Sequence, residues 1–324
     1  MKRLAIAAGI FWAGALSAQP ELTVYTYESF FTEWGPGPRI KAAFEDQCDC
    51  RLNLLGIGDG ATFLARLRLE GTRNRADVVL GLDTNQIATA RETGLFAPSG
   101  VEADYDLPVP WDDPLFVPYD WSLFAFVHRK ETLAPGSFRE LADSDLKIII
   151  QDPRSSTPGL GLLLWVRDAY GDEAPGIWKG LADNIVTVTP GWSESYGLFL
   201  DGESDMVLSW TTSPAYHRIA EDDDSIEAAL FSEGNYAQIE VAARLKNSRE
   251  PELAQEFLQF LLSDKAQAAF MTGNWMYPAV LPPGGLAEGF DPPPAPEKVL
   301  LLDPERAAAL RDEALAEWLD ALSR

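Results

Sequence analysis

The regular alternation of short apolar strand segments with amphipathic helix segments constrains the fold most strongly. Strands separated by helices usually pair in parallel, and the helices then cover the faces of the sheet. In the first half we expect strands at 22–27, 52–55 and 77–80, and helices at 38–45 and 61–70. In the second half we expect strands at 148–150 and 206–210, and helices at 158–170 and 173–181. The pattern predicts an α/β fold in which each half of the chain builds its own sheet.

Two long apolar segments, 116–130 and 235–245, are typical of extended strands that run from one such unit to the other. A chain of 324 residues also exceeds the usual size of one hydrophobic core. We therefore predict two lobes, each a mainly parallel sheet flanked by helices, joined by crossing strands that form a hinge. Residues 19–118 plus 236–285 are assigned to lobe 1, and residues 119–235 plus 286–324 to lobe 2. Helices are expected at 251–262 and 264–271, a proline-rich connector at 282–296, and a final helix at 304–322.

Residues 1–18 have the features of a secretory signal peptide. Lys2 and Arg3 precede an apolar run from residue 4 to 13, and small residues follow at Ala15 and Ala18. No later segment approaches the ~20 apolar residues that a membrane helix needs, and the first cysteine lies too far on for a lipid anchor. We predict a protein that diffuses freely in the periplasm, as a monomer, without direct membrane insertion.

The formal net charge of −24 limits the possible partners. Nucleic acids and anionic membrane surfaces would be repelled by such an acidic protein. A cationic ligand is compatible with this charge, although acidity also serves solubility alone.

Cys48 and Cys50 are separated by one residue and are the only cysteines in the chain. An oxidising compartment favours a disulfide, and each cysteine has only the other as a partner, although the ring would be tight. Two thiolates without a nearby histidine make a poor zinc site, which is the weaker interpretation. We do not expect a metal.

Aromatic residues are unusually dense among polar residues between Gly191 and Tyr216. Trp192, Tyr196, Trp210 and Tyr216 stand there beside serines, threonines and carboxylates. Aromatic faces stack on planar or cationic groups, so this stretch is typical of a site for a flat ligand. The alternative is that these rings fill the core.

Further candidate residues follow the predicted strands, where ligands bind in open α/β sheets. Tyr27 and Trp34 come after the first strand, and Trp275 lies near a lobe boundary. The pairs Asp59–Gly60 and Ser156–Thr157 open two helices, whose free N–H groups attract hydroxyl or phosphate oxygens. Ordinary helix capping is the alternative for both pairs.

Two other classes of protein are less compatible with the sequence. An exported hydrolase would need one of the two histidines, His128 or His217, beside an activated serine, and the G-x-S-x-G signature is missing. We therefore expect no enzyme. A polyamine-binding protein is the closer alternative, because it also uses carboxylates and rings, but it has no need of the two helix openings. Ferric-ion binders commonly use adjacent tyrosines, and the chain has no Tyr-Tyr pair.

Several long strings resemble one family in the same order along the chain. They are TVYTYESF, WGPGP, ADVVLGLD, QDPRSSTPGLGLLLW, GWSESYGLFLDGESD, TTSPAY, EVAAR and TGNWMYP, and they extend from about Leu22 to Pro278. These strings are similar to those of periplasmic thiamine-binding proteins, the solute-binding components of bacterial thiamine ABC importers. The C-x-C pair is also shared with this family.

The resemblance implies a type II periplasmic solute-binding fold that holds thiamine, thiamine monophosphate or thiamine diphosphate between its lobes. It implies delivery to a membrane permease with its ATPase, after closure about the hinge. By motif, Asp59–Gly60 and Ser156–Thr157 would meet the hydroxyethyl or phosphate end of the ligand. The rings that would pack on the ligand are those of Tyr27, Trp192, Tyr216 and Trp275.

One segment departs from the family pattern. The family string Y-T-T-S corresponds here to Trp210, Thr211, Thr212 and Ser213, which we include among the candidate ligand-binding residues. The indole of Trp210 keeps a stacking face but has only an N–H donor in place of a phenolic hydroxyl.

Overall fold

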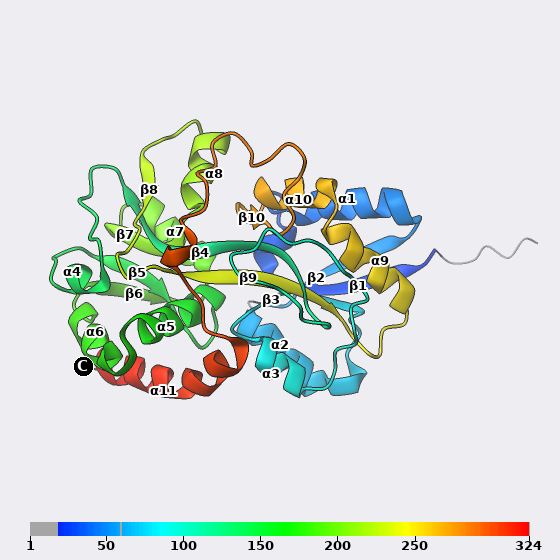
Figure 1. The fold of residues 1–324 in the computed structure, drawn as a ribbon, viewed down its shortest axis with the longest axis horizontal. Coiled ribbons are helices and arrows are strands. Elements are labelled where there is room, and N and C mark those ends of the chain that lie inside the picture. The colour runs from blue at the N-terminus through cyan, green and yellow to red at the C-terminus, as the bar shows by residue number, and fades with distance from the viewer. Residues whose placement is uncertain (1–18, 59, 324) are drawn as a thin grey trace, which may run out of the picture.

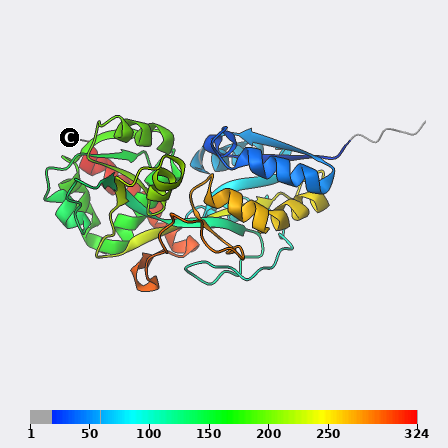
Figure 2. The same ribbon diagram turned by 90° about the horizontal axis from the view of Figure 1, so that it is seen from above.

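The computed structural model describes residues 19–58 and 60–323. The predicted signal peptide and the candidate residue Asp59 therefore lie outside the described residues. Figure 1 shows long strands through the middle of the molecule, and Figure 2 shows two lobes side by side. The predicted two-lobed α/β fold is thus confirmed.

The first lobe is built on three parallel strands. They are β1 (Glu21–Thr26), β2 (Arg51–Gly56) and β3 (Val78–Asp83), in the order β2-β1-β3. Its helices are α1 (Gly37–Cys48), α2 (Gly60–Glu70), α3 (Ile87–Glu92), α9 (Pro251–Leu261) and α10 (Asp264–Met271). Apolar residues fill both faces of this sheet. One cluster includes Val24, Phe44 and Phe257, and the other includes Tyr25, Leu67 and Val79.

The second lobe is built on β7 (Met206–Trp210), β5 (Ile148–Gln151) and β6 (Ile185–Thr189), which are also parallel. Its helices are α4 (Phe138–Ala142), α5 (Thr157–Tyr170), α6 (Ala174–Leu181), α7 (Trp192–Leu200), α8 (Ser213–Ala220) and α11 (Pro304–Leu322). The final helix α11 packs on α5 and α6, and its Trp318 is buried in the same core as Trp165. Figure 1 shows α11 in red along this side of the molecule.

Two long antiparallel strands, β4 (Val117–Arg129) and β9 (Asn235–Arg244), join the lobes. β9 pairs with β3 of the first lobe, while the second half of β4, from Phe124 to His128, pairs with β7 of the second lobe. Both strands are almost entirely buried, which agrees with their continuous apolar sequences. Short strands β8 (Ile226–Ala228), β10 (Tyr277–Pro278) and β11 (Val299–Leu300) extend this connection. The predicted crossing strands are confirmed.

The predicted elements match the observed ones within a few residues, but the aromatic stretch after Gly191 contains more structure than its pattern indicated. It folds as helix α7, strand β7 and helix α8 in succession. Helices α3 and α4 and strand β6 were not predicted either, because they are short and carry weak periodicity.

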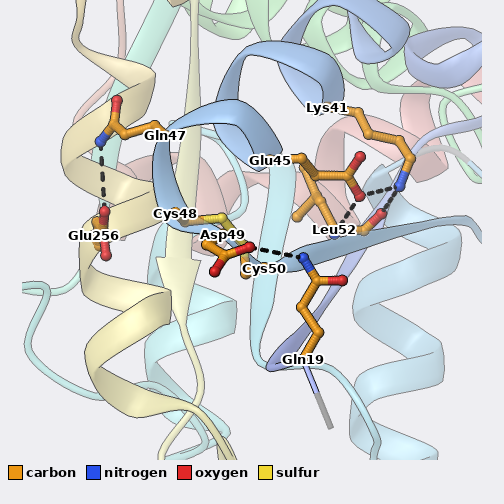
Figure 3. Close-up of a disulfide and its surroundings, with 9 residues drawn as sticks. All are labelled: Gln19, Lys41, Glu45, Gln47, Cys48, Asp49, Cys50, Leu52 and Glu256. Atoms are coloured by element: carbon orange, nitrogen blue, oxygen red, sulfur yellow. Dashed lines mark hydrogen bonds and ion pairs between the residues drawn. A yellow bond between two sulfur atoms is a disulfide. The ribbon is translucent and has the colours of Figure 1, made fainter. Parts of the chain in front are cut away.

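A disulfide joins Cys48 and Cys50 at the turn between α1 and β2 (Figure 3). Asp49 between them has a φ of 48°, in the left-handed region that Asp tolerates better than most residues. The side chain of Gln19 donates to Asp49 across this turn. The disulfide thus ties the end of α1 to the start of β2. Among the described residues, no helix is long and apolar enough to cross a membrane.

Candidate functional site

A cavity of about 550 Å³ lies between the lobes. This volume is in the range of sites that bind small organic molecules. Residues of both lobes line it, and β9 contributes Gln238 and Glu240. The lining is mainly apolar and aromatic, with a few polar groups, as is usual for cofactor-sized ligands.

The second lobe contributes one aromatic wall. Trp192 opens helix α7, Tyr196 follows one turn later, and Trp210 ends β7. The ring of Trp192 lies 5.0 Å from that of Tyr196 and 5.5 Å from that of Trp210, measured between centroids. Its indole N–H donates to Ser209 Oγ at 2.9 Å, which fixes the plane of the ring. The predicted clustering of these rings therefore arises from a helix packed on the end of a strand.

A second group of rings comes from both lobes. Tyr216 of α8 and Trp275, which follows α10, meet edge to face with centroids 5.3 Å apart. Trp275 has a φ of 56°, a left-handed conformation that is costly for a bulky residue and is concentrated at functional sites. Tyr27 and Trp34 complete the aromatic lining from the first lobe, and Trp34 is the most exposed of these rings at 56%.

The two helix openings also line the cavity, and they lie close to each other. A Cβ atom placed on Gly60, at the start of α2, would lie 2.8 Å from Thr157 Oγ1 at the start of α5. The lobes are therefore in contact at this point, and a residue larger than glycine would have to displace the side chains of Thr157 and Gln86. Ser156 precedes α5 and is fully buried, yet its hydroxyl has no hydrogen-bond partner among the described residues. An orphan buried hydroxyl is unfavourable unless a ligand or water completes it.

A polar network closes the side of the cavity formed by the crossing strands. Glu240 Oε2 accepts from the hydroxyl groups of Tyr27 at 3.1 Å and Tyr119 at 2.7 Å, and from Asn274 Nδ2 at 3.1 Å. Gln238 donates to Glu240 Oε1 at 3.1 Å and accepts from the indole of Trp210 at 2.8 Å. Burial and the neighbouring carboxylates raise the pKa of Tyr27 well above its usual value.

Most of the predicted site residues line this cavity. They are Tyr27, Trp34, Gly60, Thr157, Trp192, Trp210, Ser213, Tyr216 and Trp275. Three others do not reach its surface. Thr211 and Thr212 point to Ser122 of β4, with oxygen–oxygen distances of 3.3 and 3.0 Å, and Ser156 is buried behind Thr157. The reason is that the turn after β7 directs these two threonines into the protein, while Trp210 and Ser213 stay at the cavity.

Several lining residues were missed by the sequence reasoning. Gln238 and Glu240 belong to a crossing strand whose apolar pattern indicated only core. Asn274 and Met276 flank Trp275 but carry no motif by themselves. The one available signal was Glu240 in the string EVAAR, a charged residue within a strand that is otherwise apolar. Charged residues in such positions are rarely buried without a functional reason.

His217 has partners that do not form a hydrolytic triad. Its Nε2 lies 2.8 Å from the Tyr196 hydroxyl, and its Nδ1 lies 2.7 Å from Glu221 Oε2. His128 instead contacts the backbone oxygen of Arg129. Within residues 19–58 and 60–323, no group of three His, Cys, Asp or Glu side chains is placed to hold a metal ion.

Comparisons with known proteins agree with this geometry. Residues 35–272 match the family model described as bacterial extracellular solute-binding protein. The chain is 54% identical over 312 residues to the thiamine-binding periplasmic protein of Escherichia coli K12, covering 95% of each chain.

Solved structures give the same result. A periplasmic thiamin binding protein superimposes with a TM-score of 0.91 at 52% identity, covering 98% of this chain and 100% of its own. The iron-bound HitA of Pseudomonas aeruginosa superimposes with a TM-score of 0.77 at 20% identity, over 93% of this chain and 99% of its own. At that identity, the second likeness concerns the type II fold alone.

Proposed function

The chain belongs to the family of bacterial extracellular solute-binding proteins, and from this premise we propose that it binds thiamine in the periplasm for import. Relatives at this level of identity over nearly the full length are named for thiamine binding and for the periplasm. The members of the family are solute-binding proteins rather than enzymes. The ligand is thiamine, with thiamine monophosphate and thiamine diphosphate as further candidates.

The observation that carries the proposal is the cavity between the lobes, with aromatic rings on both sides and an acid at the crossing strands. Thiamine consists of a flat aminopyrimidine and a permanently cationic thiazolium. Flat rings stack on the faces of Trp and Tyr, and a cationic ring gains further from their electron-rich faces. The volume, the rings and the charge of the cavity therefore all suit this ligand.

The two helix openings suit the other end of the molecule. Gly60 and Thr157 begin helices α2 and α5, whose free N–H groups attract anionic or hydroxyl oxygens. A hydroxyethyl oxygen or a phosphate ester at this position would accept from the N–H groups of these two helix starts.

Contacts between the lobes support binding by hinge closure. Gly60 meets Thr157 across the cleft, and Trp275 meets Tyr216. A ligand in the cavity beside these contacts touches both lobes only when they are close, so it stabilises the closed state by differential affinity. We propose that the closed monomer then docks on a membrane permease with its ATPase.

Titration calorimetry with a panel of ligands tests the proposal. The panel contains thiamine, its mono- and diphosphate, spermidine and ferric citrate. We expect submicromolar to micromolar binding of at least one member of the thiamine series, and a smaller radius of gyration in small-angle scattering on saturation. Binding of spermidine alone, or no thiamine binding below the millimolar range, would refute the proposal.

A further inference from the structure

Three buried carboxyl groups lie side by side across the neighbouring strands β3, β9 and β4. Glu240 of β9 is paired with Asp83 of β3 on one side and with Asp120 of β4 on the other. Asp83 and Asp120 are fully buried, whereas Glu240 is 8% exposed and lines the cavity. Of the three, Glu240 alone reaches the ligand space.

Neutral groups supply the hydrogen bonds of Glu240. Tyr27, Tyr119 and Asn274 donate to Oε2, and Gln238 donates to Oε1. Tyr27 also has Asn274 Oδ1 within 3.1 Å as an alternative acceptor, so three or four donors serve Glu240. Such donors favour the ionised form of a carboxyl group, because a carboxylate only accepts. Burial nevertheless raises the pKa of Glu240 above its usual value, because these neutral donors only partly offset the loss of solvation.

Asp120 has fewer hydrogen-bond donors than Glu240. One of its oxygens accepts from Asn274 at 2.6 Å, and the other has no donor among the described residues. Burial and the charge of Glu240 raise the pKa of Asp120 well above its usual value. A hydrogen bond between the two carboxyl groups requires a proton on one of them, and the donor count places it on Asp120.

We propose that Glu240 is the counter-ion that selects a cationic ring in this cleft, and that protonated Asp120 positions it. This inference rests on the proposed function and names the residue that distinguishes a cationic ligand from a neutral one of the same shape. A buried ion is unfavourable at low dielectric until an opposite charge comes close. The donors to Glu240 are neutral, so the thiazolium provides the positive charge that stabilises the carboxylate.

The remaining titratable groups around Glu240 are acids and phenols. Asp83 faces it from β3, Tyr27 from the end of β1, and Tyr119 and Asp120 from β4. The network on the side of α10 ends in Asn274, which is neutral at all pH values of interest. A bound cation stabilises ionised Glu240 and lowers the pKa of this carboxyl group in the complex. Binding therefore releases protons at acidic pH, and the affinity for a cation falls as the pH falls.

The test compares thiamine with its neutral analogue, in which a thiophene replaces the thiazolium. Both ligands carry the same aminopyrimidine, so the ratio of their dissociation constants isolates the ring charge. In the wild-type protein we expect this preference for thiamine to decrease as the pH is lowered from 8 to 5. Calorimetry in two buffers of different ionisation enthalpy should show more protons released with thiamine than with the analogue at pH 5.

Matched variants assign the effect to the two residues. Glu240→Gln is expected to reduce the preference for thiamine by about 10- to 100-fold and to remove its pH dependence. Asp120→Asn keeps a donor toward Glu240, so it should retain the preference within about threefold, whereas Asp120→Ala should lose it.

The outcomes separate this inference from the proposed function. If the wild-type protein binds thiamine and its neutral analogue equally at every pH, the counter-ion role is wrong, and this measurement needs no variant to fold. An undiminished preference in Glu240→Gln would refute it as well. Failure of the wild-type protein to bind either ligand would instead refute the proposed function.

Discussion

Replacing Trp192 by alanine tests the aromatic wall of the second lobe most directly. One side of this ring already packs on Tyr196 and Trp210, at centroid distances of 5.0 and 5.5 Å, and the remaining surface borders the cavity. A stacked aromatic contact contributes roughly 0.5–1.5 kcal/mol beyond the apolar area that it buries. Adding that area, we expect Trp192→Ala to weaken thiamine binding by about 1–3 kcal/mol. This corresponds to roughly 5- to 150-fold in Kd.

The same substitution also affects stability, so the two effects must be separated. It removes the hydrogen bond to Ser209 Oγ, although Ser209 keeps its contact with Ser213 at 2.8 Å. Trp192→Phe is the matched control, because it retains an aromatic ring but loses the five-membered ring with its N–H donor, and the lost hydrogen bond contributes about 0.5–1.5 kcal/mol. Titration calorimetry gives Kd for the three proteins, and urea unfolding gives their free energies of unfolding.

We expect the wild-type protein to bind thiamine most tightly, Trp192→Phe slightly more weakly, and Trp192→Ala most weakly. Binding by Trp192→Ala within twofold of wild type, at a temperature where both proteins are folded, would refute the reasoning. It would mean that Trp192 packs only against Tyr196 and Trp210. A loss as large in Trp192→Phe as in Trp192→Ala would assign the effect to the Ser209 hydrogen bond instead.

Three further variants probe other parts of the molecule. Ser156→Ala removes a hydroxyl that has no partner among the described residues and does not reach the cavity, so we expect an unchanged free energy of unfolding and an unchanged Kd for thiamine and thiamine monophosphate, measured by calorimetry. Weaker binding of either ligand would show that Ser156 belongs to the site. Replacing Cys48 and Cys50 by serine should lower the free energy of unfolding by about 1–2 kcal/mol, since the closed loop is short, and leave Kd unchanged. Burial raises the pKa of Asp83 to about 7. The folded protein therefore keeps a proton that the unfolded chain releases above about pH 4, and the free energy of unfolding falls as pH rises to 7. Asp83→Asn should make this fall shallower in urea titrations at pH 5 and 7, and an identical pH dependence would contradict the buried proton.

The sequence predicted most of the fold because its signals are local. Apolar segments of β1, β2 and β3 alternate with helices that begin at proline or glycine, and such segments form the same structure in most contexts. The two crossing strands were also visible as unusually long apolar runs. Short elements such as β6 and α4 were missed, since four or five residues carry too little periodicity.

The candidate site was predictable in its residue types but less so in its geometry. Dense rings after Gly191 correctly indicated an aromatic cluster, because polar sequences seldom contain so many. The sequence did not show that Thr211 and Thr212 turn toward Ser122 while Trp210 and Ser213 stay at the cavity. The direction of a side chain in a turn depends on the backbone path after β7, which packing determines.

The sequence by itself determined the order of most strands and helices, the two-lobed organisation and the aromatic residues available to the site. Only the tertiary structure brought Asp83, Asp120 and Glu240 together across three neighbouring strands. These residues are far apart in the chain, and each lies within or at the end of a strand that otherwise reads as core. Their proximity follows from the antiparallel register of β9 with β3 and β4. That register is fixed by contacts over long sequence separations, and no local pattern encodes it.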